Sequence, residues 1–210
     1  MLNRVFILIA DGPAYGLKPG YITIPIFPIL FRGDHLLPIL RNFNATQGDT
    51  NYPLVLEVSE RLLFEDNEMV ATALTEIKGM GIELSLRNFG ADNSPLSCIH
   101  NYPLDYLKIA PSCVQSLDRN SPNSTLCTII TQMAHAFNLQ IIAEGVVTES
   151  QYTFLKNLNC DYGQGSLFCE PIAEKDLLQS QTKNTSGSWN RVKSVVQSLK
   201  IKEKQNKTIN

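Results

Sequence analysis

Residues 81–109, GIELSLRNFGADNSPLSCIHNYPLDYLKI, hold the pattern that decides the fold. They contain two apolar β-type runs, from Ile82 to Leu86 and from Leu104 to Ile109. A loop rich in Gly, Asp, Asn, Ser and Pro separates the two runs at residues 90–95, and this composition is typical of turns. The stretch therefore predicts strand, loop and strand.

Polar side chains stand where these two runs end. Arg87 and Asn88 follow the first run, and Lys108 lies near the end of the second run. If the strands are parallel, their carboxyl ends share one rim, and such rims carry ligand sites. We therefore expect a site at this end of the sheet.

Strand and helix patterns alternate along the rest of the chain with short connectors, which predicts a parallel α/β sheet or barrel. Further strands are predicted at Tyr21–Phe27, Leu54–Val58, Leu139–Ala143 and within Cys160–Phe168. Helices are predicted at about 34–43 and 65–78, after a cap at 121–123, and from a capping box at 148–151.

Several positions sharpen these predictions. Pro25 argues for an edge strand or a bulge, because proline cannot donate to a sheet ladder. The helix at 65–78 should bury its apolar stripe, made by Val70, Leu74 and Ile77. The helix after residue 123 should bury one face formed by Leu126, Ile129, Ile130, Met133 and Phe137, and the helix from 148 should bury Phe154, Leu155 and Leu158.

Composition favours one domain with a tail. The chain has 210 residues, is 43% hydrophobic and carries a net charge of -2, so no overall field would steer it to nucleic acid or a membrane. Seven of the 18 basic residues lie from Lys183 onward, beside one acid, Glu203. We expect the remnant of a preceding helix and a connector at 1–20, a domain at 21–179, and a polar linker and basic amphipathic tail at 180–210. The tail is expected to be a terminal helix packed on the body with a frayed basic end, in preference to an arm that binds nucleic acid or a membrane.

The five cysteines are widely spaced and contain no C-x-x-C pair, so neither a disulfide framework nor a zinc site is indicated. The apolar start, Val5 to Ala10, is too short for a secretory signal or a membrane span. These features favour a cytoplasmic protein.

The predicted strand ends bring together six polar side chains, among them two carboxylates, a lysine and an amide. This set matches a metal-assisted phosphoester hydrolase, in which carboxylates bind Mg²⁺ or Mn²⁺ and lysine positions the activated water. Each residue taken singly is more often a strand-end cap or a surface ion pair. The set consists of Glu57, Arg87, Asn88, Lys108, Glu144 and Gln164.

Five segments, in the right order, resemble the motifs of EAL-type cyclic di-GMP phosphodiesterases, which are modified TIM barrels. They are LEVSE (56–60), LRNFGADNSPLS (86–97), PLDYLKI (103–109), IIAEGVVTESQ (141–151) and CDYGQGSLFCEP (160–171). The resemblance implies a TIM-barrel-like EAL fold with parallel strands.

The resemblance also implies roles for single residues. Glu57 and Glu144 match metal ligands, Lys108 matches the water-orienting lysine, and Gln164 matches an active-site glutamine. Glu60 matches the glutamate that holds the loop after the family's aspartate pair. Candidate ligand-binding residues are Arg87, Asn88, Glu60 and Asp92.

The departures from the family pattern affect function. Arg87 and Asn88 replace the aspartate pair that bridges two metals, so we expect two metals not to bind. Pro25 and Ala110 replace an asparagine and an aspartate, and Ala91-Asp92 replaces the family's T-G. The E-A-L signature is absent from the chain, which predicts a barrel without its first strand and helix.

Two functions follow as alternatives. The first is a catalytically inactive regulatory or interaction module in cyclic di-GMP signalling, without a cofactor, whose partner would be cyclic di-GMP, another protein or a second copy of the chain. The second is an active phosphodiesterase using Mg²⁺ or Mn²⁺ to convert cyclic di-GMP to linear pGpG, completed by sequence or a partner outside this chain. Arg87 would either neutralise Glu57 and Glu144, the favoured hypothesis, or contact a phosphate.

Overall fold

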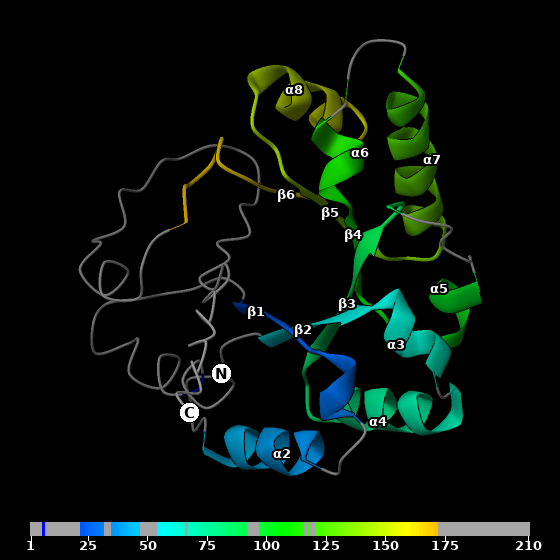
Figure 1. The fold of residues 1–210 in the computed structure, drawn as a ribbon, viewed down its shortest axis with the longest axis vertical. Coiled ribbons are helices and arrows are strands. Elements are labelled where there is room, and N and C mark those ends of the chain that lie inside the picture. The colour runs from blue at the N-terminus through cyan, green and yellow to red at the C-terminus, as the bar shows by residue number, and fades with distance from the viewer. Residues whose placement is uncertain are drawn as a thin grey trace, which may run out of the picture.

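The computed structural model describes residues 6, 22–31, 35–46, 54–65, 67–91, 97–115, 117 and 121–171. Over this part of the chain, strands alternate with helices as predicted, and the strands form one curled sheet (Figure 1). The predicted tail at 180–210 and nearly all of the connector at 1–20 lie outside the described residues, so the predicted domain boundaries stay predictions. No helix in the described part is long and apolar enough to cross a bilayer.

All six strands are parallel, and their order in the sheet is their order in the chain. This arrangement is that of a β/α barrel wall. The strands are β1 (Ile22–Pro25), β2 (Leu54–Ser59), β3 (Glu83–Phe89), β4 (Tyr106–Ile109), β5 (Gln140–Glu144) and β6 (Tyr162–Gln164).

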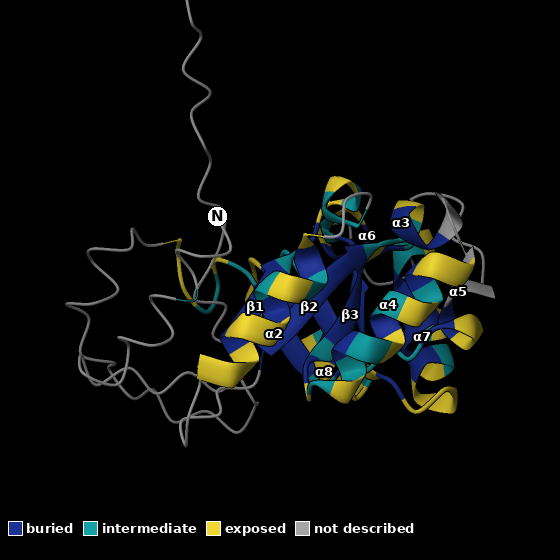
Figure 2. Ribbon diagram, turned by 90° about the horizontal axis from the view of Figure 1, so that it is seen from below, coloured by how far each residue is buried: buried dark blue, intermediate teal, exposed yellow. Residues whose placement is uncertain are grey.

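The helices cover the convex side of the curled sheet (Figure 1). Figure 2 shows their outer surfaces exposed and the strands between them buried. The helical elements are η2 (Pro28–Leu30), α2 (Leu36–Thr46), α3 (Glu60–Glu65), α4 (Asn67–Gly79), α5 (Ser97–Asn101), α6 (Pro111–Gln115), α7 (Pro122–Ala136) and α8 (Glu149–Asn157).

The two faces of the sheet have different chemistry. The helix-covered face is aliphatic, and its fully buried side chains join the main core. The opposite, concave face carries a small separate cluster of Val55, Tyr106, Ile142 and Tyr162. Because successive side chains of a strand point to opposite faces, the same strands also place polar groups on the concave side. These buried polar residues are Thr23, Glu57, Ser85, Lys108 and Gln164.

Local signals predicted the helix starts correctly. Ser121 caps α7, since its hydroxyl accepts from the Ser124 N–H at 3.2 Å. Thr148 and Gln151 form the predicted capping box at α8. Pro25 lies in the terminal strand of the described sheet, which confirms the edge position.

The core contacts of two predicted helices are also confirmed. Val70, Leu74 and Ile77 of α4 are buried, with exposed fractions of 1% or less. Leu155 of α8 is fully buried, and Phe154 and Leu158 pack against the core as partly buried neighbours.

Three details of the prediction are wrong. The strand predicted from Ile82 to Leu86 continues to Phe89, so Arg87 and Asn88 lie inside β3 and not after it. The strand predicted from Leu104 begins at Tyr106, because the Leu104 N–H bonds to Tyr102 O in a turn. The short helix α3 directly follows β2 and was not predicted.

The predicted buried face of α7 is also partly wrong. Ile129 and Phe137 are 56% and 42% exposed, although both are large and apolar. The buried side of the helix consists of Ser124, Cys127, Ile130, Thr131 and Ala134. Small residues allow a helix to approach the sheet closely, so size alone was a poor guide to which side faces inward.

Candidate functional site

The candidate site lies at the carboxyl ends of the strands, on the concave face. Glu57 of β2, Lys108 of β4, Glu144 of β5 and Gln164 of β6 come from four strands. The parallel register brings these ends to one rim, as predicted from the sequence. The structure therefore gathers the two carboxylates, the lysine and the glutamine in one region.

Lys108 is the central group of this site. Its Nζ donates to Glu57 Oε1 at 2.7 Å and lies 3.5 Å from Glu144 Oε2. The side chains of Lys108 and Glu57 are only 4% and 9% exposed, whereas that of Glu144 is 27% exposed. A buried ammonium thus lies within ion-pair distance of both carboxylates that the sequence offered as metal ligands.

The backbone fixes Glu144 and Gln164 relative to each other. They are register partners, and the N–H groups of Gly145 and Val146 both donate to Gln164 O, at 2.8 and 3.0 Å. Gly165 then passes so close to Val146 that an added Cβ would lie 2.1 Å from Val146 O. This contact explains why glycine follows Gln164 here.

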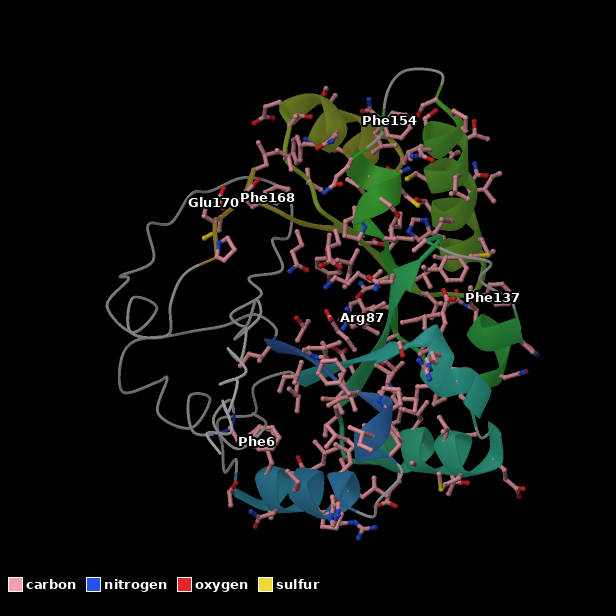
Figure 3. All side chains as sticks on the ribbon, in the orientation of Figure 1. Phe6, Arg87, Phe137, Phe154, Phe168 and Glu170 are labelled. Atoms are coloured by element: carbon pink, nitrogen blue, oxygen red, sulfur yellow. The ribbon has the colours of Figure 1, made fainter. Side chains whose placement is uncertain are left out.

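Arg87 and Asn88 lie where the pairing of β3 and β4 is irregular. Regular register stops at Leu86 and resumes at Phe89, as in a β-bulge. Asn88 has φ +60°, a left-handed conformation that asparagine tolerates better than most residues, and its side chain is exposed. Arg87 is partly buried, and Figure 3 shows it near the middle of the curled sheet.

The structure does not support the favoured hypothesis for Arg87. Among the described residues, no ion pair joins Arg87 to Glu57 or Glu144, and Lys108 contacts both carboxylates instead. The physical reason is register, because β4 lies between β3 and β5 and places Lys108 at the centre of the rim. The neutralising cation of the site is therefore Lys108.

Sequence reasoning missed Ser85. Its side chain is fully buried, and its Oγ has no hydrogen-bond partner in the described part of the chain. It is the register partner of Glu57 and shares a strand face with Arg87, two residues on. The available signal was the alternation of polar residues at 83, 85 and 87, which marks the polar face of an otherwise apolar strand.

The predicted roles of two other residues, Glu60 and Asp92, are not tested by the described part of the structure. Asp92 lies outside the described residues. Glu60 is the first residue of α3 and partly buried, and the loop it was predicted to hold includes residues 92–96, which are also outside. Their proposed ligand-binding roles stay predictions.

The arrangement does not suit a divalent cation. Mg²⁺ and Mn²⁺ need several oxygen ligands free to coordinate, but an ammonium lies beside both Glu57 and Glu144. Position 87 adds a second positive charge on the same strand ends. In the described residues, no group of three or more His, Cys, Asp or Glu side chains is placed to hold a metal ion.

The EAL domain family model matches residues 1–171. The chain belongs to the EAL domain family. The described part of this EAL domain has six parallel strands in a curled, TIM-barrel-like wall, as the resemblance implied.

Curated relatives with named activities support the membership. The bifunctional diguanylate cyclase/cyclic di-GMP phosphodiesterase MucR of Pseudomonas aeruginosa is 33% identical over 159 residues, which cover 76% of this chain and 23% of MucR. The cyclic di-GMP phosphodiesterase NbdA of the same organism is 32% identical over 57% of this chain and 15% of NbdA. The EAL domain thus spans about one-fifth of the curated relatives it matches, 22% and 21% of two others.

Solved structures share the fold. A cyclic di-GMP complex of the MucR phosphodiesterase matches with a TM-score of 0.68 and 29% identity, covering 75% of this chain and 64% of that one. The EAL domain of Mycobacterium smegmatis DcpA matches with a TM-score of 0.70 and 26% identity, covering 83% and 80%. A manganese and cyclic di-GMP complex of Klebsiella pneumoniae BlrP1, at 18% identity and a TM-score of 0.68, covers 79% and 43% and shows likeness of fold alone.

Proposed function

We propose that this EAL domain is catalytically inactive and serves as a regulatory or interaction module in cyclic di-GMP signalling. The observation that carries the proposal is the buried contact of Lys108 with Glu57 and Glu144. The two carboxylates that would bind metal in a phosphodiesterase are already engaged with a cation of the chain itself.

The electrostatics at Arg87 and Asn88 support the same conclusion. Aspartates at these positions would carry two negative charges, whereas the residues present carry one positive charge. At about 4 Å and an effective dielectric near 20, each unit charge interacts with another by about 4 kcal/mol. A guanidinium in place of a carboxylate therefore opposes a divalent cation strongly, and the carboxamide of Asn88 is a weak ligand.

The alternative function is an active phosphodiesterase, completed by sequence or a partner outside this chain. One observation favours it: Glu57, Lys108, Glu144 and Gln164 keep both their identities and a common rim. Two curated relatives also carry cyclic di-GMP phosphodiesterase in their names. In that case a metal would have to displace Lys108 from the carboxylates.

Hydrolysis of cyclic di-GMP decides between the two. The domain is incubated with cyclic di-GMP and Mg²⁺ or Mn²⁺, and formation of pGpG is followed by chromatography. We expect no product above a buffer blank, and turnover by the unaltered domain would overturn the proposal. An Arg87→Asp/Asn88→Asp variant, joined to the upstream sequence of a related EAL domain, tests whether the lost carboxylates are what prevents hydrolysis.

A further inference from the structure

We propose that residues 189–199 of the basic tail dock, as an amphipathic helix, on an exposed apolar patch just beyond the end of β1. The patch consists of Phe27, Pro28 and Ile29, and we call it the η2 patch. This contact within the chain goes beyond the proposed function, and it does not depend on whether the domain hydrolyses cyclic di-GMP.

The η2 patch exposes two large apolar side chains that are two residues apart. Phe27 is 52% exposed and Ile29 is 68% exposed, the highest value for a large apolar residue in the described part of the chain. Single apolar side chains on a surface are ordinary, whereas contiguous ones mark contact surfaces. The patch therefore indicates a surface that another segment covers.

The turn that carries the η2 patch is held in place by its own hydrogen bonds. The Leu30 N–H donates to Phe27 O at 2.9 Å, and the Phe31 N–H donates to Pro28 O at 3.0 Å. Leu30 and Phe31 pack against the main core, so they anchor the turn while Phe27 and Ile29 stay exposed. A surface fixed in this way loses less conformational freedom on docking than a flexible loop would.

The tail supplies a matching apolar face. Trp189, Val192, Val196 and Leu199 recur at helical spacing, so a helix would carry them on one side. Amphipathic helices bind apolar surfaces through a stripe of this kind. The only tryptophan of the chain lies in this stripe, and tryptophan is a common anchor residue at protein contacts.

The described chain ends on a side of the molecule from which the tail can reach the η2 patch. Figure 1 shows α7 on the side of the curled sheet opposite the two edge strands, β1 and β6. Figure 3 places Phe168 and Glu170, close to the end of the described chain, on the side of these edge strands. The connector at 172–188 spans about 55 Å when extended, more than the width of a domain of this size. Such a tether also keeps the tail at a high local concentration.

Charge favours the tail over a second copy of the domain. From Lys183 onward the chain carries seven basic residues and one acid, and 11 basic and 19 acidic residues precede this segment. The positive tail is therefore attracted to the negative body, whereas the bodies of two copies repel each other. Both the charge and the apolar stripe thus point to the tail as the segment that covers the η2 patch.

The test uses Trp189 as a fluorescent probe in the full chain. Docking removes the indole from water, so its emission should lie at shorter wavelength than in urea, and acrylamide should quench it weakly. Phe27→Ser/Ile29→Ser should shift the emission to longer wavelength and raise the quenching constant about twofold or more, because the indole returns to water. Val192→Ser/Val196→Ser should have the same effect from the tail side.

Ile129→Ser is the matched control. Ile129 is 56% exposed, but it lies on α7, away from β1 (Figure 1). This variant removes an equally exposed apolar side chain and should leave the emission and the quenching of Trp189 unchanged.

Limited proteolysis gives a second readout. Trypsin reaches Arg191 and Lys193 only when the tail is undocked, so initial cleavage there should be about tenfold slower in the unaltered chain than in Phe27→Ser/Ile29→Ser. Cleavage after Lys183, in the connector, is the internal reference and should proceed equally in both. Mass spectrometry identifies the sites.

Four outcomes would overturn the inference. They are a fully solvated Trp189 in the unaltered chain, an unchanged signal in Phe27→Ser/Ile29→Ser, an equal change in Ile129→Ser, and a signal that depends on chain concentration, which marks contact with a second copy. Thermal melting shows whether each variant is folded, and Val192→Ser/Val196→Ser leaves the body unaltered. Failure here leaves the proposed function intact, because that function fails only on turnover.

Discussion

Lys108 Nζ lies 2.7 Å from Glu57 Oε1, and the two residues are 51 positions apart in the chain and almost wholly buried. A buried ion pair need not stabilise a fold more than apolar residues would. Removing one partner, however, leaves a buried charge without compensation, which costs about 3–5 kcal/mol.

Lys108→Met should therefore destabilise the domain by about 3–5 kcal/mol, because the buried carboxylate of Glu57 would lose its ion-pair partner. Glu57→Gln combined with Lys108→Met should recover part of the loss, since no buried charge remains. Urea denaturation measures both. Lys78→Met is the control: its partner Asp105 is 28% exposed, so we expect a loss of no more than about 1 kcal/mol. Equal losses in the two lysine variants would contradict this account of Lys108.

Metal should leave the stability of the domain unchanged. A ligand that binds only the folded state raises the melting temperature, and Lys108 and Arg87 oppose such binding by Mg²⁺ or Mn²⁺. We expect equal melting temperatures in EDTA and in millimolar Mn²⁺. Arg87→Asp/Asn88→Asp is the informative variant, because it restores carboxylates and should gain a Mn²⁺-dependent rise. A clear rise in the unaltered chain would show that Lys108 yields its place to a metal.

Gly165→Ala should prevent normal folding or destabilise the domain severely. The new Cβ would lie 2.1 Å from Val146 O and 2.5 Å from Val146 N, at a backbone φ of +157°. Backbone atoms cannot move aside as a flexible side chain can, so the connection between Glu144 and Gln164 would be disturbed. Gly79→Ala is the matched control, since nothing lies within 4 Å of its added Cβ. It should be neutral or stabilise by up to about 1 kcal/mol. Similar melting curves for both variants would refute the close approach.

The fold could be predicted because its signals are local. Apolar runs predicted the strands, and the hydroxyls of Ser121 and Thr148 predicted two helix starts. The strand ends also predicted which residues share a rim. What could not be predicted was pairing within the site: Lys108 engages Glu57 and Glu144 because of strand register and side-chain length, and neither appears in sequence spacing.

The orphaned hydroxyl of Ser85 was beyond prediction for a related reason. A serine inside an apolar strand is compatible with either face and with many partners. Only the assembled sheet shows that its Oγ is buried without a hydrogen-bond partner among the described residues. Ile129 of α7 was wrongly predicted to be buried, because it is large and apolar. In the structure it is exposed, and smaller residues of α7 form most of the buried side of the helix.

The buried thiols should make the domain less stable at alkaline pH. Burial raises the pKa of both Cys127 and Cys160 from 9.0 to about 12, and it also raises the pKa of Cys113. Because these groups hold their protons more tightly when folded, their contribution is complete below pH 9 and is lost as pH rises toward 12. Each buried thiol should lower the free energy of unfolding by up to about 1.4 kcal/mol per pH unit between pH 9 and 12.

Urea denaturation at increasing pH measures this loss of stability per pH unit. Cys127→Ala should reduce the loss by the contribution of one thiol.

Alkylation gives a second readout. At pH 8, iodoacetamide should modify the exposed Cys169 readily, while the buried Cys113, Cys127 and Cys160 stay unreacted until urea unfolds the chain. Mass spectrometry identifies the modified residues. Rapid alkylation of Cys127 in the folded chain would show that α7 opens from the sheet far more easily than its burial implies.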